Sequence, residues 1–199
     1  MTVNVDITGT AGILKVKAEI NGTGLILLTG RNGSGKTTIM RMIAGQISIQ
    51  SGSIVLNGKN VTFEPLNRRK IVFINHDSVL SELTVDSHIR WSRSNTTEEE
   101  VSLIKERMGV NYSGKVKDLS LGQRMRVSIA SAILSRPGAI LLDEILANIS
   151  EKSLVLENVR TISREKNIDF IVASQIKMPE IAWDASYVVE NGITSKIAD

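Results

Sequence analysis

The sequence predicts an α/β fold built on a parallel β-sheet, with antiparallel strands near the N-terminus and an all-helical insertion. Four short apolar runs lack the alternation of a half-exposed strand, which is typical of strands covered by helices on both faces. These runs are Leu25–Thr29, Ile71–Asn75, Ile140–Asp143 and Phe170–Ser174. Helical patterns separate them, and only helical patterns occupy the middle of the chain, from about residue 78 to residue 136.

Strand and turn signals precede and follow the first of these runs. Val3–Thr8 and Ile13–Ile20 read as two strands, with a glycine-containing turn at residues 9–12. Asn57-Gly58 predicts a hairpin between 53–56 and 60–63, because both turn residues accept a positive φ. We therefore expect an N-terminal antiparallel β subdomain beside the parallel core.

Helices are predicted from apolar spacing and from the residues that begin and end each segment. Gly45 and Gly109 are stop signals, and acidic residues open the second helix, where the helix dipole is positive. The four expected helices are Lys36–Ala44, Thr97–Met108, Leu121–Ser135 and Glu151–Lys166. With 199 residues the chain fits a single domain, 1–199, in which 1–77 and 137–199 form the core and about 78–136 the helical part.

Composition excludes several classes of protein. The chain has no cysteine, which excludes disulfides, zinc ribbons and thiol nucleophiles, and its two histidines leave little for a histidine-built metal site. Its longest apolar runs are far below the roughly 20 residues that span a bilayer, and no leader opens it, so we expect a cytoplasmic protein. The net charge is +3, and the compact basic run Arg68-Arg69-Lys70 is interpreted as a solvated turn, so we expect no nucleic-acid partner.

The most informative segment is a glycine-rich loop between a predicted strand and a predicted helix. It fits the pattern G-x-x-x-x-G-K-[ST], in which backbone amides and a helix N-terminus surround a phosphate. Its candidate nucleotide ligands are Gly30, Arg31, Asn32, Gly33, Ser34, Gly35, Lys36, Thr37 and Thr38. Lys36 would reach the β- and γ-phosphates of ATP, and the Thr37 hydroxyl would ligate Mg²⁺.

An acidic pair follows the strand Ile140–Asp143. Asp143 emerges at the carboxyl end of that strand, where α/β proteins bind ligands, and it would hold Mg²⁺ directly or through water. Glu144 is placed to activate a water molecule on the γ-phosphate as a general base. Together with the glycine-rich loop, the pair predicts a catalytic site for ATP hydrolysis.

Leu119-Ser120-Leu121-Gly122-Gln123 resembles the signature motif of ABC-type ATPases, usually LSGGQ, with Leu121 in place of the first glycine. It lies between the two nucleotide motifs, in the order and approximate spacing of that family. Leu83-Thr84-Val85 resembles the stretch that opens the family's helical subdomain. The resemblance covers about residues 13–195, and it implies a P-loop NTPase fold.

The resemblance implies a dimer in which each ATP lies between one subunit's phosphate loop and the other's signature. Ser120 and the amide of Gly122 would then bind the γ-phosphate across the interface, with Gln123 as a further candidate nucleotide ligand. The second subunit could be identical or different. It further implies that the chain powers an ABC transporter through a separate transmembrane permease, docked near residues 76–95 at the inner face of the membrane.

Four departures from the family pattern predict a slow or asymmetric ATPase. His76 stands where the family usually has a glutamine, and its imidazole either contacts Mg²⁺ or is a plain exposed loop histidine. Gln175 stands at the position of the family's switch histidine, where its amide can hydrogen-bond the γ-phosphate in a catalytic role but cannot carry charge. Residues 145–150 replace the usual PTSALD, with Ser150 expected to cap the next helix. No aromatic residue precedes Phe63, so the ring that commonly stacks on adenine is missing.

Two alternatives to a transporter subunit remain at this point. A soluble ABC ATPase of an assembly complex would carry the same nucleotide motifs without a permease. A different P-loop enzyme, such as a nucleotide kinase, is disfavoured by the signature at 119–123.

Overall fold

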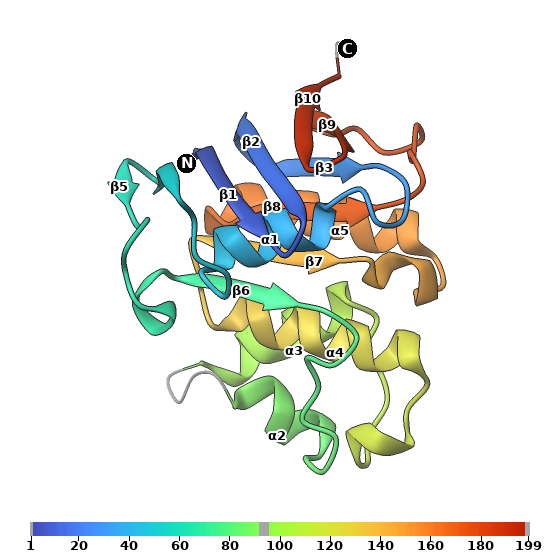
Figure 1. Cartoon of the computed structure of the whole chain (residues 1–199). Helices are drawn as coiled ribbons and strands as arrows, with labels where there is room; N and C mark the ends of the chain where they lie inside the picture. Colours follow the sequence, from blue (N-terminus) through green and yellow to red (C-terminus); the bar gives the residue numbers. More distant parts are fainter. Residues whose placement is uncertain (1, 92–95, 198–199) are drawn as a thin grey trace.

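The computed structural model describes residues 2–91 and 96–197 and shows one continuous ten-stranded sheet with helices on both faces (Figure 1). The strand order is β5-β4-β1-β2-β10-β9-β3-β8-β7-β6. The predicted α/β fold class is therefore confirmed, and the N-terminal strands prove to be hydrogen-bonded into the same sheet as the parallel core.

The parallel half of the sheet forms as the four apolar runs predict. Its strands are β3 (Leu25–Thr29), β6 (Ile71–Ile74), β7 (Ala139–Asp143), β8 (Asp169–Ser174) and β9 (Ala185–Glu190). Every residue of β3 and β7 is buried, because one cluster of apolar side chains covers each face of the sheet. All of these strands run parallel, so their carboxyl ends lie at one edge.

The antiparallel half contains β1 (Val3–Ala11), β2 (Leu14–Gly22), β4 (Ser51–Leu56), β5 (Lys59–Asn60) and β10 (Ile193–Lys196). Buried and exposed residues alternate in β1, as expected for a strand with one face packed on the core. The predicted strand 60–63 is shorter than expected. The Asn60 side chain accepts hydrogen bonds from the backbone and hydroxyl of Thr62, and the Ile54 amide of β4 donates to the Thr62 hydroxyl in place of a backbone carbonyl, so the regular ladder ends at Asn60.

The hairpin of β9 and β10 was not among the sequence predictions. Asn191 and Gly192 form its turn with φ of 48° and 82°, the same Asn-Gly signal that predicts the 57–58 hairpin. β10 pairs with both β9 and β2, so this hairpin joins the two halves of the sheet.

The helical insertion lies on one side of the sheet (Figure 1) and consists of α2 (Val85–Arg90), α3 (Glu98–Arg107) and α4 (Leu121–Leu134). α4 is buried along most of its length and contacts both other helices. Thr97 caps α3 by accepting a hydrogen bond from the Glu100 amide, which confirms the predicted start of that helix.

The two core helices are α1 (Lys36–Ala44) and α5 (Lys152–Lys166), on opposite faces of the sheet. The expectation that Ser150 caps α5 is wrong. The N-cap is Glu151 in a left-handed conformation with no side-chain cap, and the Ser150 carbonyl instead accepts a hydrogen bond from Arg126. The helix therefore starts later than the Ser-based signal suggested.

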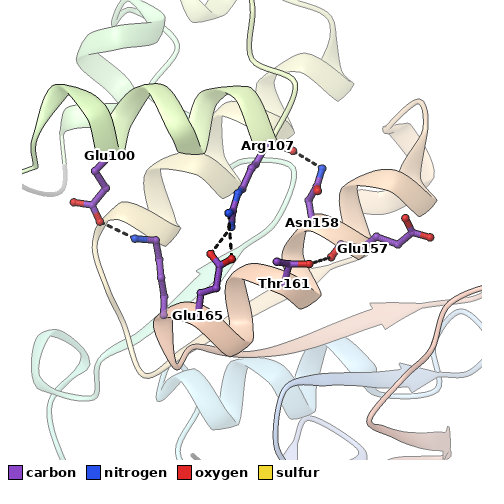
Figure 2. A network of polar contacts seen from close by, with 7 residues as sticks. Glu100, Arg107, Glu157, Asn158, Thr161 and Glu165 are labelled. Atoms are coloured by element: carbon purple, nitrogen blue, oxygen red, sulfur yellow. Dashed lines mark hydrogen bonds and ion pairs between the residues drawn. The ribbon is translucent and has the colours of Figure 1, made fainter.

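Polar contacts tie the insertion to the core between α3 and α5 (Figure 2). Lys166 Nζ lies 2.8 Å from Glu100, and Arg107 forms an ion pair with Glu165. Asn158 donates a hydrogen bond of 2.7 Å to the Arg107 carbonyl. These contacts join α3 to α5 at both ends of α3, at Glu100 in its first turn and at Arg107, its last residue.

The basic run 68–70 is not simply a solvated turn, as the sequence suggested. Arg69 is 8% exposed, and its guanidinium donates to the backbone carbonyls of Glu64, Ile43 and Thr62. Burial lowers the pKa of Arg69. This side chain binds the end of α1 to the loop before β6.

His88 lies in the packed interior of the insertion. It is 5% exposed, and neither ring nitrogen has a hydrogen-bond partner in the described residues. Burial lowers the pKa of His88, so the unfolded chain takes up a proton below pH 6.5 that the folded chain resists. Stability is therefore lost as the pH falls.

We expect the free energy of unfolding to decrease between pH 7 and pH 5, with a slope approaching about 1.4 kcal/mol per pH unit from this group. His88→Leu should flatten that part of the profile, and urea unfolding at several pH values measures it. An unaltered profile for His88→Leu would contradict the assignment.

Candidate functional site

The glycine-rich loop runs from the end of β3 into the start of α1 and folds tightly against the β9–β10 hairpin. Gly30 and Gly35 have φ of 155° and 108°. A Cβ atom on Gly30 would lie 2.4 Å from the Val189 carbonyl oxygen, and one on Gly35 would lie 3.1 Å from Gly192 Cα. The backbone therefore approaches its neighbours as only glycine permits.

Lys36 lies under this loop and is 3% exposed. Its ammonium donates to the carbonyls of Gly30, at 2.7 Å, and Arg31, at 3.1 Å. It also forms an ion pair with Glu144 at 3.0 Å. The predicted phosphate-binding lysine and the predicted general base are thus in direct contact, at the carboxyl edge of the parallel strands.

Thr37 and Asp143 also meet, as the sequence predicted. The Thr37 hydroxyl donates a 3.0 Å hydrogen bond to Asp143 Oδ1. Desolvation raises the pKa of Asp143, and the hydrogen bond from Thr37 opposes that shift. A hydroxyl and a carboxylate are the hard oxygen ligands that Mg²⁺ prefers, and Mg²⁺ completes its shell with water and phosphate oxygens. The pair fits such an ion.

The loop also fits an anion. Ser34 is 8% exposed and its hydroxyl has no hydrogen-bond partner in the described residues. The first amides of α1, a nine-residue helix, have no acceptor within the helix and carry its positive dipole end. A cavity of about 440 Å³ beside the loop is lined by Gly30, Arg31, Asn32, Gly33, Ser34, Val188, Val189, Glu190 and Asn191. These are the features of a phosphate cradle.

A second cavity, of about 130 Å³, brings Glu144 together with Gln175. Gln175 follows β8 and Glu144 follows β7, which are adjacent parallel strands. Glu144 has a φ of 55°, so the chain turns sharply after Asp143, and the carboxylates of Asp143 and Glu144 point in different directions. The predicted pairing of Glu144 and Gln175 around one reaction centre is consistent with this shared cavity.

His76 is exposed on the segment after β6, the edge strand next to β7. In the described residues it forms no hydrogen bond or ion pair with Thr37 or Asp143. Those residues also contain no cluster of three histidine, cysteine, aspartate or glutamate side chains around a metal position. The Mg²⁺ role of His76 therefore stays a prediction.

The signature segment forms the start of α4. Ser120 accepts a hydrogen bond from the Gln123 amide, and the Gln123 side chain accepts one from the Ser120 amide, a reciprocal capping box. The Tyr112 hydroxyl donates to the Gln123 carbonyl, and burial raises the pKa of Tyr112 to about 12. Across the described ranges, no hydrogen bond or cavity joins Ser120, Gly122 or Gln123 to the phosphate loop of the same chain.

Sequence reasoning did not assign Glu190, Asn191 or Lys152 to the site, although these residues line the two cavities. Glu190 and Asn191 come from the β9–β10 hairpin, which the Asn191-Gly192 turn signal could have revealed. Lys152 lines the smaller cavity with Glu144 and Gln175. Nothing in its sequence neighbourhood marks it, because its position depends on how α5 meets β8.

A comparison with protein families matches residues 13–147 to the ABC transporter family model. The chain belongs to the ABC transporter family. Similar curated proteins include the molybdenum import ATP-binding protein ModC of Mesorhizobium japonicum, 33% identical over 95% of this chain and 55% of that protein. The spermidine/putrescine import ATP-binding protein PotA of Fusobacterium nucleatum is 32% identical over 86% of this chain and 48% of that protein. The ABC chain spans about half the length of these relatives.

Solved structures support the fold of this ABC transporter chain. An ABC transporter ATP-binding protein from Pyrococcus furiosus has a TM-score of 0.80 at 22% identity, with 95% of this chain and 98% of that chain covered. A bacterial Atm1-family ABC exporter with ATP bound has a TM-score of 0.80 at 20% identity, with 98% of this chain and 38% of that chain covered. Both confirm the P-loop NTPase fold. Within the described residues no helix has the length and apolarity to span a membrane.

Proposed function

We propose that the chain binds MgATP and hydrolyses it to ADP and phosphate. The contact that carries this proposal is the joint position of Lys36, Glu144, Thr37 and Asp143, two directly linked pairs at one edge of the sheet. Family membership supports ATP as the nucleotide, since the relatives are named ATP-binding proteins.

Each residue has a defined role in that reaction. The loop 30–38 wraps the phosphates with its amides, Lys36 neutralises the β- and γ-phosphates, and Thr37 and Asp143 hold Mg²⁺. Mg²⁺, when bound, supplies charge neutralisation between the β- and γ-phosphates. Glu144 leaves Lys36 and takes a proton from the attacking water. Gln175 hydrogen-bonds the γ-phosphate without carrying charge, so hydrolysis is slow.

The active form is a dimer, identical or mixed, with ATP between one subunit's loop 30–38 and the other's signature. This proposal is supported by the location of the signature within one chain. Ser120, Gly122 and Gln123 are exposed or half-exposed at the start of α4, with no link to their own phosphate loop in the described parts of the chain. A second subunit would supply them to the nucleotide at a helix N-terminus.

The chain couples this dimer to a separate membrane permease, which would place it at the inner face of the membrane. The relatives are named as import ATP-binding proteins, which supports transport as the process that ATP hydrolysis drives. Of the proposed docking segment 76–95, residues 92–95 lie outside the described residues, and within 76–91 the apolar side chains of Leu80 and Trp91 are 41% and 69% exposed. A cavity of about 300 Å³ lies beside it, lined in part by Asp77, Val79 and Leu80.

Hydrolysis that depends on dimer formation should rise faster than linearly with protein concentration. We expect the specific ATPase rate to increase several-fold across the concentration range in which size-exclusion chromatography with MgATP shows dimer formation. Lys36→Ala should remove the activity at every concentration, because it removes the buried phosphate cation. A monomeric sample as active as a dimeric one would contradict the dimer.

The permease is tested by capture from the source cell with tagged Glu144→Gln protein and MgATP, which should hold the closed dimer. Recovery of an integral membrane protein supports the transporter function. Recovery of the dimer with soluble proteins only would instead assign the chain to an assembly complex.

A further inference from the structure

The reaction centre proposed above has an uneven charge distribution. Two carboxylates, Asp143 and Glu144, follow β7, whereas the buried cation Lys36 already forms an ion pair with Glu144. Gln175, which lines the smaller cavity together with Glu144, is neutral. Breaking the bond to the γ-phosphoryl group spreads negative charge over its oxygens, so a second cation near Gln175 would stabilise the transition state.

Lys152 is such a cation. It lines the same cavity as Glu144 and Gln175 and is only partly exposed. Within residues 2–91 and 96–197, no hydrogen bond or ion pair to the Lys152 side chain is found, although many other lysines of the chain are paired. Its ammonium is therefore available to a ligand in the cavity.

The position of Lys152 in α5 adds a second argument. It is the first residue of a fifteen-residue helix whose first turn has no acidic residue and no side-chain cap. A cation there is unfavourable, because it faces the positive end of the helix dipole. An anion in the cavity would offset this, since it would meet the Lys152 ammonium near the start of α5.

We propose that Lys152 is a catalytic residue that binds an oxygen of the γ-phosphoryl group through its ammonium during ATP hydrolysis. In that step a water oxygen bonds to the γ-phosphorus while the bond from phosphorus to the β–γ bridging oxygen breaks. The electron pair leaves with ADP, and Glu144 takes the water's proton. Lys152 keeps its protons throughout and contributes charge only. This inference rests on the proposed ATPase function.

The test compares Lys152→Gln with Lys152→Arg and with the control Lys196→Gln, which removes a charge from an exposed position on β10. We expect Lys152→Gln to lower kcat about tenfold with a small change in KM, because the contact strengthens as charge develops. Lys152→Arg should restore most of kcat, and Lys196→Gln should match the wild type. Thermal unfolding of all four proteins identifies any loss of folding.

A binding measurement keeps the test valid for a slow enzyme. The quantity measured is the ratio of the affinity for a non-hydrolysable ATP analogue to the affinity for ADP. This ratio should be lower in Lys152→Gln than in the wild type, and Lys196→Gln should have the wild-type ratio. Unchanged kcat and an unchanged ratio in a folded Lys152→Gln protein would overturn the inference. If the wild type binds neither nucleotide, or if the Lys36→Ala variant hydrolyses ATP at the wild-type rate, the proposed function itself fails. This inference then fails with it.

Discussion

Glu144→Gln is expected to lower the ATPase rate by 10² or more while leaving nucleotide binding intact. The amide cannot accept the proton of the attacking water, and Glu144 is the carboxylate that shares a cavity with Gln175 and touches Lys36. Because the ion pair with Lys36 is also lost, the ammonium becomes free for phosphate. We therefore expect nucleotide affinity to be equal or higher, and the MgATP dimer to persist on size exclusion.

The matched control is Glu157→Gln, the same chemical change at an exposed position of α5. It should leave the ATPase rate within twofold of the wild type. Residual hydrolysis by Glu144→Gln equal to that of the wild type would show that another group is the base or that the activity is a contaminant.

Arg69→Ala is expected to have the largest effect on stability. The guanidinium is the donor to three carbonyls, with its Nη2 atom 2.6 Å from the Thr62 oxygen and its Nη1 atom 3.1 Å from the Ile43 oxygen. Alanine leaves buried acceptors without a donor, so we expect the free energy of unfolding to fall by about 3 kcal/mol or more. Urea unfolding monitored by circular dichroism measures it.

Two further variants make this prediction specific. Arg69→Lys should remain destabilised, because an ammonium cannot reproduce the planar set of donors. Arg68→Ala, at the exposed neighbour, should change stability by less than about 0.5 kcal/mol. Equal effects at 68 and 69 would contradict the structural role of Arg69.

The phosphate loop and its acidic partners were predictable because their signal is local. The spacing of the glycine-rich motif alone predicted the roles of Lys36 and Thr37. The apolar strand that ends at Asp143 predicted the roles of Asp143 and Glu144. The structure then places each in contact with a partner from the other segment. Sequence order on parallel strands suffices here, since their carboxyl ends share one edge of the sheet.

The remaining features depend on contacts between distant segments, which local patterns do not contain. Arg69 reads as part of a charged turn, yet the end of α1 approaches it closely enough to bury it. Ser150 reads as a cap, but its carbonyl pairs with Arg126 from α4. Lys152 reads as a helix surface residue, and only the packing of α5 beside β8 brings it to the cavity.

The strand order has a consequence for how the protein emerges from the ribosome. β3, which ends at the phosphate loop, pairs with β8 and β9. Leu25 therefore cannot pair until Phe170 has been synthesised, and Leu28 cannot pair with β9 until Tyr187 has been synthesised. The β9–β10 hairpin also supplies the Val189 and Gly192 backbone against which the loop is folded. A nascent chain therefore cannot shape its phosphate cradle until nearly all of its residues have been translated, and nucleotide cannot assist the folding of the earlier part.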